Sequence, residues 1–140
     1  MAVKWYLPAL EAALEGNLNL LTADVRAVCV DAADYTFAET HDFLDDIPGG
    51  ARVATSGTLQ NVTVAVTSGE VRVDADDIEI AGVTGDQFEA VVLYVHDGGA
   101  DSARRLVCYI DSGTGLPFTP SGGAVLLRWN ASGIAYLANV

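Results

Sequence analysis

Basic residues are scarce in this chain. It has 7 lysine and arginine residues against 19 aspartate and glutamate residues, which gives a formal net charge of -12 at pH 7. Proteins that bind nucleic acid use Lys and Arg to neutralise phosphates, and the only basic pair here is Arg104-Arg105. We therefore expect no nucleic acid partner. An acidic surface favours solubility and suits a protein displayed at high density, or one that docks on a basic surface.

Long hydrophobic runs are also missing. No apolar run reaches the roughly 18 residues of a membrane span, so we expect no membrane partner. The N-terminal stretch MAVKWYLPALEAALEG does not have the form of a signal peptide, because Glu11 and Glu15 interrupt its apolar part. We expect synthesis in the cytoplasm. The 51% apolar composition excludes a disordered chain, and 140 residues fit a single domain over residues 1–140.

Cysteine occurs only twice. Cys29 lies in the apolar run AVCV and Cys108 in LVCYI. These surroundings predict two buried thiols that pack as small hydrophobic side chains. A cytoplasmic origin argues against a disulfide. The sequence itself leaves the pairing open, because a disulfide requires the two Cα atoms to lie within about 7 Å.

Helical signals are confined to short stretches. PALEAALEG, residues 8–16, begins with Pro8, which suits a first helical turn, and ends with Gly16, which suits a stop. THDFLDDI, residues 40–47, begins with Thr40, which we interpret as the N-cap of a single helical turn near residues 40–46. We therefore predict one short N-terminal helix and one helical turn.

From residue 51 onward the pattern is that of β-strands. NVTVAVT (61–67) alternates strictly, with its three valines on one face. FEAVVLYV (88–95) and RLVCYI (105–110) are apolar on both faces, which is typical of central strands covered on each side. Further strands are predicted at 25–30, 70–80, 125–129 and 134–137. Asn130–Gly133 has the length of a hairpin loop between the last two.

Many short strands separated by glycine-containing turns define the predicted fold class. The pattern predicts an all-β protein, either an antiparallel β-sandwich or a jelly-roll-like barrel. Helices between the later strands would indicate an α/β fold, and the pattern has none there.

Two acidic stretches are candidate metal sites. In THDFLDDI, His41 and Asp45 have the i, i+4 relation of converging ligands on a helix, but a solvated structural turn explains the carboxylates. VDADDIE (73–79) departs from a calcium loop, because Glu79 stands where glycine is required. We predict no tightly bound metal ion at either stretch.

Signs of catalysis are absent from the sequence. It has no G-x-S-x-G nucleophile elbow. GTGLPF (113–118) lacks the third glycine of a dinucleotide loop, and there is no P-loop lysine. We expect a non-enzymatic protein without a cofactor, whose function depends on a surface.

The candidate interaction residues are Trp5, Tyr6, Asp97, Asp101 and Phe118. Trp5 and Tyr6 precede the predicted helix, and aromatic residues near a chain end are favoured interface anchors. The alternative is that they fold back on the core beside Trp129. The loops Asp97–Asp101 and Ser112–Pro120 are the next candidates for a docking surface.

Three blocks of sequence together resemble a family of small virion structural proteins of tailed bacteriophages. They are YLPALEAALEGNLNLLTADVRAVCVDAADYTF, THDFLDDIPGGARVATSGTLQNVTV and VDADDIEIAGVTGDQFEAVVLYVHDGGADSARRLVCYIDSGTGLPFTPSGGAVLLRWNASGIAYL. The order of the blocks is similar along nearly the whole chain.

The resemblance implies a virion component rather than a reaction. Its preferred form is a capsid decoration protein that binds the outer capsid lattice, with the major capsid protein as partner and self-association in the lattice as a further contact. The alternative is a tail-associated structural protein or a host-surface module that binds carbohydrate through residues such as Tyr35, Phe37, Phe118 and Asp97. The resemblance also implies that the THDFLDDI stretch is a linker that precedes the β-domain.

Overall fold

The computed structural model describes residues 3–97 and 99–138. They form ten β-strands, one α-helix and three short 3-10 helices. The strands are β1 (Val3–Trp5), β2 (Val25–Val30), β3 (Arg52–Thr55), β4 (Thr63–Thr67), β5 (Glu70–Asp74), β6 (Ile78–Ile80), β7 (Ala90–Val95), β8 (Leu106–Ile110), β9 (Val125–Leu127) and β10 (Ala135–Ala138). The helices are α1 (Leu7–Leu14), η1 (Leu44–Asp46), η2 (Gly49–Ala51) and η3 (Asp101–Ala103).

A five-stranded sheet in the order β1-β8-β7-β2-β3 forms the centre of the molecule. All of its strand pairs are antiparallel. Every residue of β7 and β8 is buried, which confirms that these two apolar strands lie centrally. Successive residues of a strand point to opposite faces, so each face of this sheet needs its own cover.

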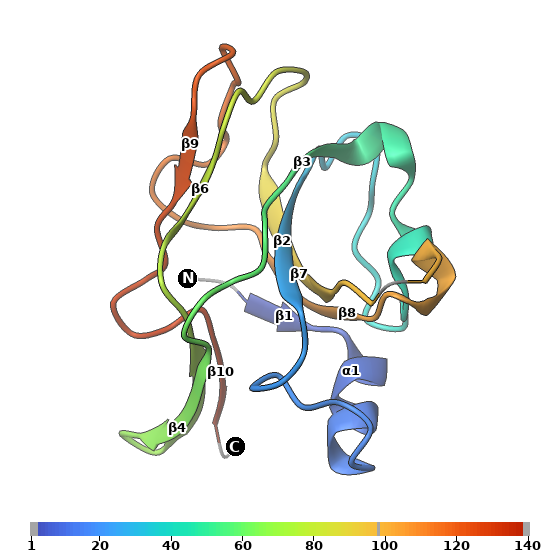
Figure 1. The fold of residues 1–140 in the computed structure, drawn as a ribbon, viewed down its shortest axis with the longest axis vertical. Helices are drawn as coiled ribbons and strands as arrows, with labels where there is room; N and C mark the ends of the chain where they lie inside the picture. Colours follow the sequence, from blue (N-terminus) through green and yellow to red (C-terminus); the bar gives the residue numbers. More distant parts are fainter. Residues whose placement is uncertain (1–2, 98, 139–140) are drawn as a thin grey trace.

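Two clusters of buried side chains supply that cover. One face packs against the smaller sheets β10-β5-β4 and β6-β9, with Val91, Leu93 and Ile134 in the shared core. The other face is covered by Tyr6 and by side chains of the segment 35–51. Figure 1 shows the small sheets on the left of the central sheet, and α1 with the 3-10 turns on the right.

This layered antiparallel arrangement confirms the predicted all-β sandwich, and the described strands form no closed barrel. The predicted N-terminal helix is present as α1, with Pro8 in its first turn. The predicted helical turn is the 3-10 helix η1. Its N-cap is Phe43 without a side-chain hydrogen bond, so the expectation that Thr40 caps the turn is wrong.

One expectation about the later strands is also wrong. The strands on either side of the loop 130–133 do not form a hairpin, because β9 pairs with β6 and β10 pairs with β5. In the alternating stretch NVTVAVT, Val62 packs partly buried against the core, whereas Val64 and Val66 are exposed. Every residue of β4 is exposed, because the β4–β5 hairpin extends beyond the central sheet.

Both cysteines lie in central strands. Cys29 of β2 is opposite Val91 of β7, and Cys108 of β8 is opposite Leu93 of the same strand. The thiols are thus separated by two strand spacings, about 10 Å, which is too far for a disulfide. Both are free and buried, which confirms the expected packing.

Burial makes both thiols unreactive. Desolvation raises the pKa of Cys29 to about 12 and that of Cys108 to about 12. At pH 8 roughly one thiol in ten thousand is then a thiolate. We expect a disulfide-exchange reagent such as Ellman's reagent to label neither cysteine in the folded protein and both in denaturant. Labelling of the folded protein at the rate of free cysteine would contradict this placement.

Candidate functional site

The aromatic pair at the start of the chain is part of the fold. β1 pairs with β8 and places Trp5 opposite Cys108, so Trp5 and Tyr6 point to opposite sides of the central sheet. Tyr6 is 0% exposed. The Trp5 ring is partly buried, and its indole N–H donates to the Tyr136 carbonyl over 2.9 Å. The expectation that this stretch is free to reach a neighbour is therefore wrong for Tyr6, because strand pairing buries it.

Tyr6 belongs to a buried chain of polar groups. Its hydroxyl lies 3.0 Å from the Tyr35 hydroxyl, which in turn lies 2.8 Å from Nδ1 of His41. Burial, followed by the contact with Tyr35, raises the pKa of Tyr6 above its usual range. The Tyr35 hydroxyl is therefore the hydrogen-bond partner of Nδ1 of His41.

The second histidine is likewise held by neighbours. Nδ1 of His96 lies 3.2 Å from the Tyr94 hydroxyl, and Nε2 lies 3.4 Å from a guanidinium nitrogen of Arg104. Burial and then the charges of Arg26 and Arg104 lower the pKa of His96. His96 is half-buried and lies directly after the last residue of β7.

Asp101, a candidate interaction residue, takes part in an ion-pair network. Its carboxylate accepts from Arg52 over 2.7 Å and from Arg104 over 3.1 Å. Arg52 also donates to the carbonyls of Ile47 and Leu44, so one guanidinium joins η1, β3 and η3. The hydrogen bond from Arg52 lowers the pKa of Asp101. Asp101 therefore has a structural role, as the ion-pair partner of Arg52 and Arg104.

The other two candidates lie apart from each other. Asp97 is exposed, and its carbonyl accepts from Arg104 over 3.1 Å. Phe118 is half-buried, and its ring centroid lies 5.4 Å from that of Phe88. Asp97 and Asp101 thus meet at Arg104, whereas Phe118 belongs to a different region of the surface.

Phe118 lines an open groove of about 650 Å³. Residues 112–116 and Phe118 form part of its lining, and β9 with residues 128–130 forms another part. Phe88, Phe118 and Trp129 contribute aromatic surface, while Thr114 and Asn130 contribute polar groups. The groove is mostly apolar, which is a common property of ligand sites.

A second feature is an exposed apolar surface on the β10-β5-β4 sheet. Four of its large apolar side chains are exposed and, by their register, lie on one face: Val64, Val66, Val71 and Leu137. We call these four residues the apolar sheet face. Val73 and Ala135 continue the same face into the buried core. β4 lies at the lower left of Figure 1, at one end of the molecule.

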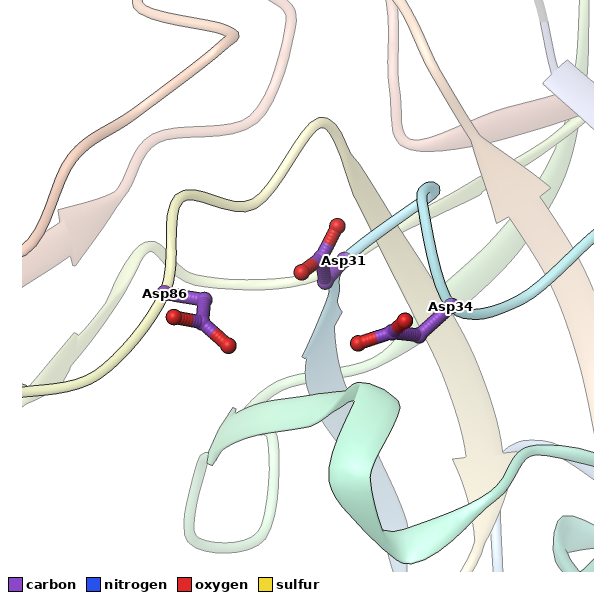
Figure 2. Close-up of side chains that lie close together, drawn as sticks. All are labelled: Asp31, Asp34 and Asp86. Carbon is purple, nitrogen blue, oxygen red and sulfur yellow. The ribbon is translucent and has the colours of Figure 1, made fainter.

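Two groups of carboxylates lie close enough to share a cation. In each group the possible ligand atoms lie within 4.8 Å of one another: Asp31, Asp34 and Asp86, and Asp42, Asp45 and Asp46. Figure 2 shows the first group, with Asp31 after β2, Asp34 in the next turn and Asp86 from the segment before β7. Sequence reasoning missed this group, because its members meet only through the pairing of β2 with β7.

Both groups have contacts within the protein. Oδ1 of Asp31 accepts from the Ala33 amide over 2.9 Å, and Oδ2 of Asp46 accepts from the Asp42 amide over 2.9 Å. Calcium sites usually supply six to eight oxygen ligands. Each group offers three carboxylates, of which at least one is exposed. The absence of a tightly bound ion stays a prediction for Asp42, Asp45 and Asp46, and we extend this prediction to Asp31, Asp34 and Asp86.

We expect micromolar calcium to leave the melting temperature unchanged. Three carboxylates without a full ligand set bind calcium only weakly, with a dissociation constant of about 10⁻⁴ M or above. The measurement is a thermal melt with and without calcium, followed by EDTA. Asp86→Asn and Asp45→Asn, each of which removes one exposed carboxylate from one group, are the controls. A rise that EDTA and either variant abolish would show a real site.

Comparison with models of known protein families finds no match for this chain, and a search of curated proteins finds no match either. None of the described residues forms a helix long and apolar enough to cross a membrane.

Proposed function

We propose that this protein is a non-enzymatic virion structural protein of a tailed bacteriophage, and that it decorates the outer capsid lattice. The proposal rests on the resemblance of its three sequence blocks to small virion proteins. The partner is the major capsid protein, and the site of function is the virion surface.

The apolar sheet face is the observation that carries an interaction function. Val66 is 79% exposed, in a chain that has a net charge of -12 and many acidic residues elsewhere on its surface. Exposed apolar patches on a soluble domain commonly mark protein–protein contacts. Such a patch fits a component of a protein shell better than a free protein in solution.

The mechanism of such a protein is mass action. A protein that binds assembled capsid but not its separated subunits stabilises the assembled state by an amount that grows with its concentration. The remaining acidic surface keeps neighbouring particles from associating.

The test uses purified protein and capsids that lack it. We expect the protein to sediment with the capsids, to saturate at a fixed number of copies and to raise the temperature at which they dissociate. Leu14→Lys is the control variant, because Leu14 lies on α1 outside the apolar sheet face and is 90% exposed. We expect this variant to bind capsids like the wild type. Failure to bind capsids at any concentration would contradict decoration.

The second candidate is a tail-associated module that binds host-surface carbohydrate. The groove that contains Phe118 and Trp129 favours it, because sugar rings pack on aromatic faces and Thr114 and Asn130 offer hydrogen-bonding groups beside them. A glycan array distinguishes the candidates. Binding that Phe118→Ala abolishes, together with a location on the tail, would favour this candidate over decoration.

A further inference from the structure

We propose that the chain forms a symmetric dimer through β4, in which the β4 strands of two copies pair antiparallel and join two three-stranded sheets into one of six strands. The inference goes beyond decoration, because it concerns the free protein. It assigns the free edge of β4 to a second copy of this chain, and the apolar sheet face, which the pairing extends, stays available for the capsid contact.

β4 is an edge strand whose sequence suits pairing with itself. It is bonded to β5 on one side, and no strand of the described chain pairs with its other side. Natural edge strands are protected from such pairing by Lys, Pro, bulges or a cover. β4 has none of these. Its sequence, Thr-Val-Ala-Val-Thr, is the same in both directions around Ala65.

A two-fold axis at Ala65 makes the strand complementary to its own copy. Val64 then lies opposite Val66 of the second copy, and Thr63 lies opposite its Thr67. A symmetric interface requires this reciprocity, in which residue i contacts j and j contacts i. Valine pairs extend the apolar sheet face across the junction, and threonine pairs lie on the opposite face. Both kinds of cross-strand pair stabilise sheets.

The main chain of β4 has the orientation that this register needs. Ser68 and Gly69 have φ values of 53° and 80°, so they form the two-residue turn that closes the β4–β5 hairpin. The residues that flank such a turn exchange both hydrogen bonds, and bonded pairs then alternate along the ladder. Thr67, Ala65 and Thr63 therefore bond to β5, and the N–H and C=O groups of Val64 and Val66 point outward.

Those outward groups meet in the proposed dimer. Val64 of each copy forms a hydrogen-bonded pair with Val66 of the other copy. One such pair lies on each side of the axis, which gives four hydrogen bonds. Ala65 then lies opposite Ala65 of the second copy in a non-hydrogen-bonded pair, in which the two Cα atoms are about 4.5 Å apart. The register set by the palindrome and the orientation set by the turn are independent, and they agree.

The charge distribution permits this contact in an acidic protein. Residues 53–69 carry no charged side chain. The nearest charges of the sheet, Glu70, Arg72 and Asp74, lie on β5. In the dimer, the two β5 strands are three strand spacings apart, about 14 Å, which exceeds the screening length of about 8 Å at physiological salt. Repulsion between the copies is therefore weak at this edge.

The interface is small, and this sets the expected affinity. One strand pair with its flanking valines falls below the roughly 1,200 Å² of standard interfaces, which is the range of weak complexes. We expect a dimer whose population rises with protein concentration. Two-fold pairing uses the β4 edge of both copies, so assembly through this edge stops at two copies.

Site-specific cross-linking tests the register directly. Under a mild oxidant, Ala65→Cys is expected to form a disulfide-linked dimer about tenfold or more faster than Thr63→Cys. Thr63→Cys is a matched control because the two Thr63 residues of the dimer lie four positions apart, about 14 Å along the strands. Cys29 and Cys108 are buried and do not interfere.

A second test uses the unmodified edge. Analytical ultracentrifugation of the full chain is expected to show concentration-dependent dimers. Val66→Lys places a charge against the second copy and raises the dissociation constant about tenfold or more. Leu14→Lys adds the same charge at an exposed leucine on α1 and leaves the dimer unchanged. Circular dichroism verifies that both variants are folded.

Three outcomes would overturn the proposal. One is a wild-type chain that remains monomeric while the two cysteine variants cross-link at equal rates. Another is growth beyond two copies. The third is a monomer whose Val66→Lys variant no longer binds capsids, which would make a capsid strand the occupant of this edge. The cross-linking and ultracentrifugation assays use the free protein and do not depend on the virion assignment, so either proposal can fail alone.

Discussion

Tyr6→Ala is expected to lower the free energy of unfolding by about 3–5 kcal/mol, the cost of truncating a large aromatic side chain in a core. Tyr6 is fully buried, and its ring centroid lies 5.0 Å from that of Phe37. Alanine removes this packing and takes the Tyr6 hydroxyl away from Tyr35. A domain of this size has only about 5–15 kcal/mol of stability in total. Urea unfolding followed by circular dichroism measures the loss.

Two control variants identify the cause. Tyr6→Phe keeps the ring and removes the hydroxyl, so it is expected to cost only about 1 kcal/mol. Tyr136→Ala removes a tyrosine that is 43% exposed and is expected to change stability much less than Tyr6→Ala. Equal effects of Tyr6→Ala and Tyr136→Ala would show that Tyr6 is not a core residue.

The same burial changes the expectation for the chain terminus. If Trp5 and Tyr6 were a docking arm, removal of residues 1–7 would leave a folded domain. The structure instead predicts that this deletion removes the strand β1 and the Tyr6 side chain from the central sheet, and so prevents cooperative folding. Loss of capsid binding by this truncation would therefore not identify a docking surface.

Arg52→Met is expected to cost about 2–3 kcal/mol. The variant keeps most of the apolar stem but loses hydrogen bonds to the carbonyls of Ile47 and Leu44 and to the Asp101 carboxylate. The Arg52 side chain is only 20% exposed, so water replaces these bonds poorly. Arg128→Met is the matched control, because Arg128 is 76% exposed and its contact with Asp77 is 3.9 Å long.

The effect of Arg52→Met depends on pH in a defined direction. Arg52 lowers the pKa of Asp101 in the folded state, so the pair stabilises the protein fully above the unfolded pKa of about 3.9. This contribution is lost as the pH falls through the lower folded pKa. The difference in stability between wild type and Arg52→Met is therefore expected to narrow below about pH 4. A difference that stays constant from pH 7 to pH 3 would contradict the role of the ion pair.

Local patterns predicted the elements of this fold well. The strand VRAVCV coincides with β2, and the doubly apolar runs are β7 and β8, because burial on both faces leaves a direct trace in composition. The N-terminal helix followed from Pro8 and Gly16. Pairing between distant strands leaves no such trace, so the partners of β9 and β10 were not predictable.

The surface was less predictable than the core for a physical reason. Alternation in β4 shows that one face is apolar, but it does not reveal whether that face lies against the core or in solvent. The three residues of β1 are too few for a pattern, so the burial of Tyr6 was invisible in the sequence. Asp31 and Asp86 meet only because β2 and β7 are neighbours. Contacts of this kind arise from topology.

The most direct measurement of the proposed capsid decoration is immunogold electron microscopy of virions of the phage that is proposed to encode this chain, with antibody against the purified protein. We predict gold particles distributed over the whole head, and their loss on virions assembled without the protein. Gold confined to the tail would contradict capsid decoration, and virions without any label would contradict a structural role on the particle surface.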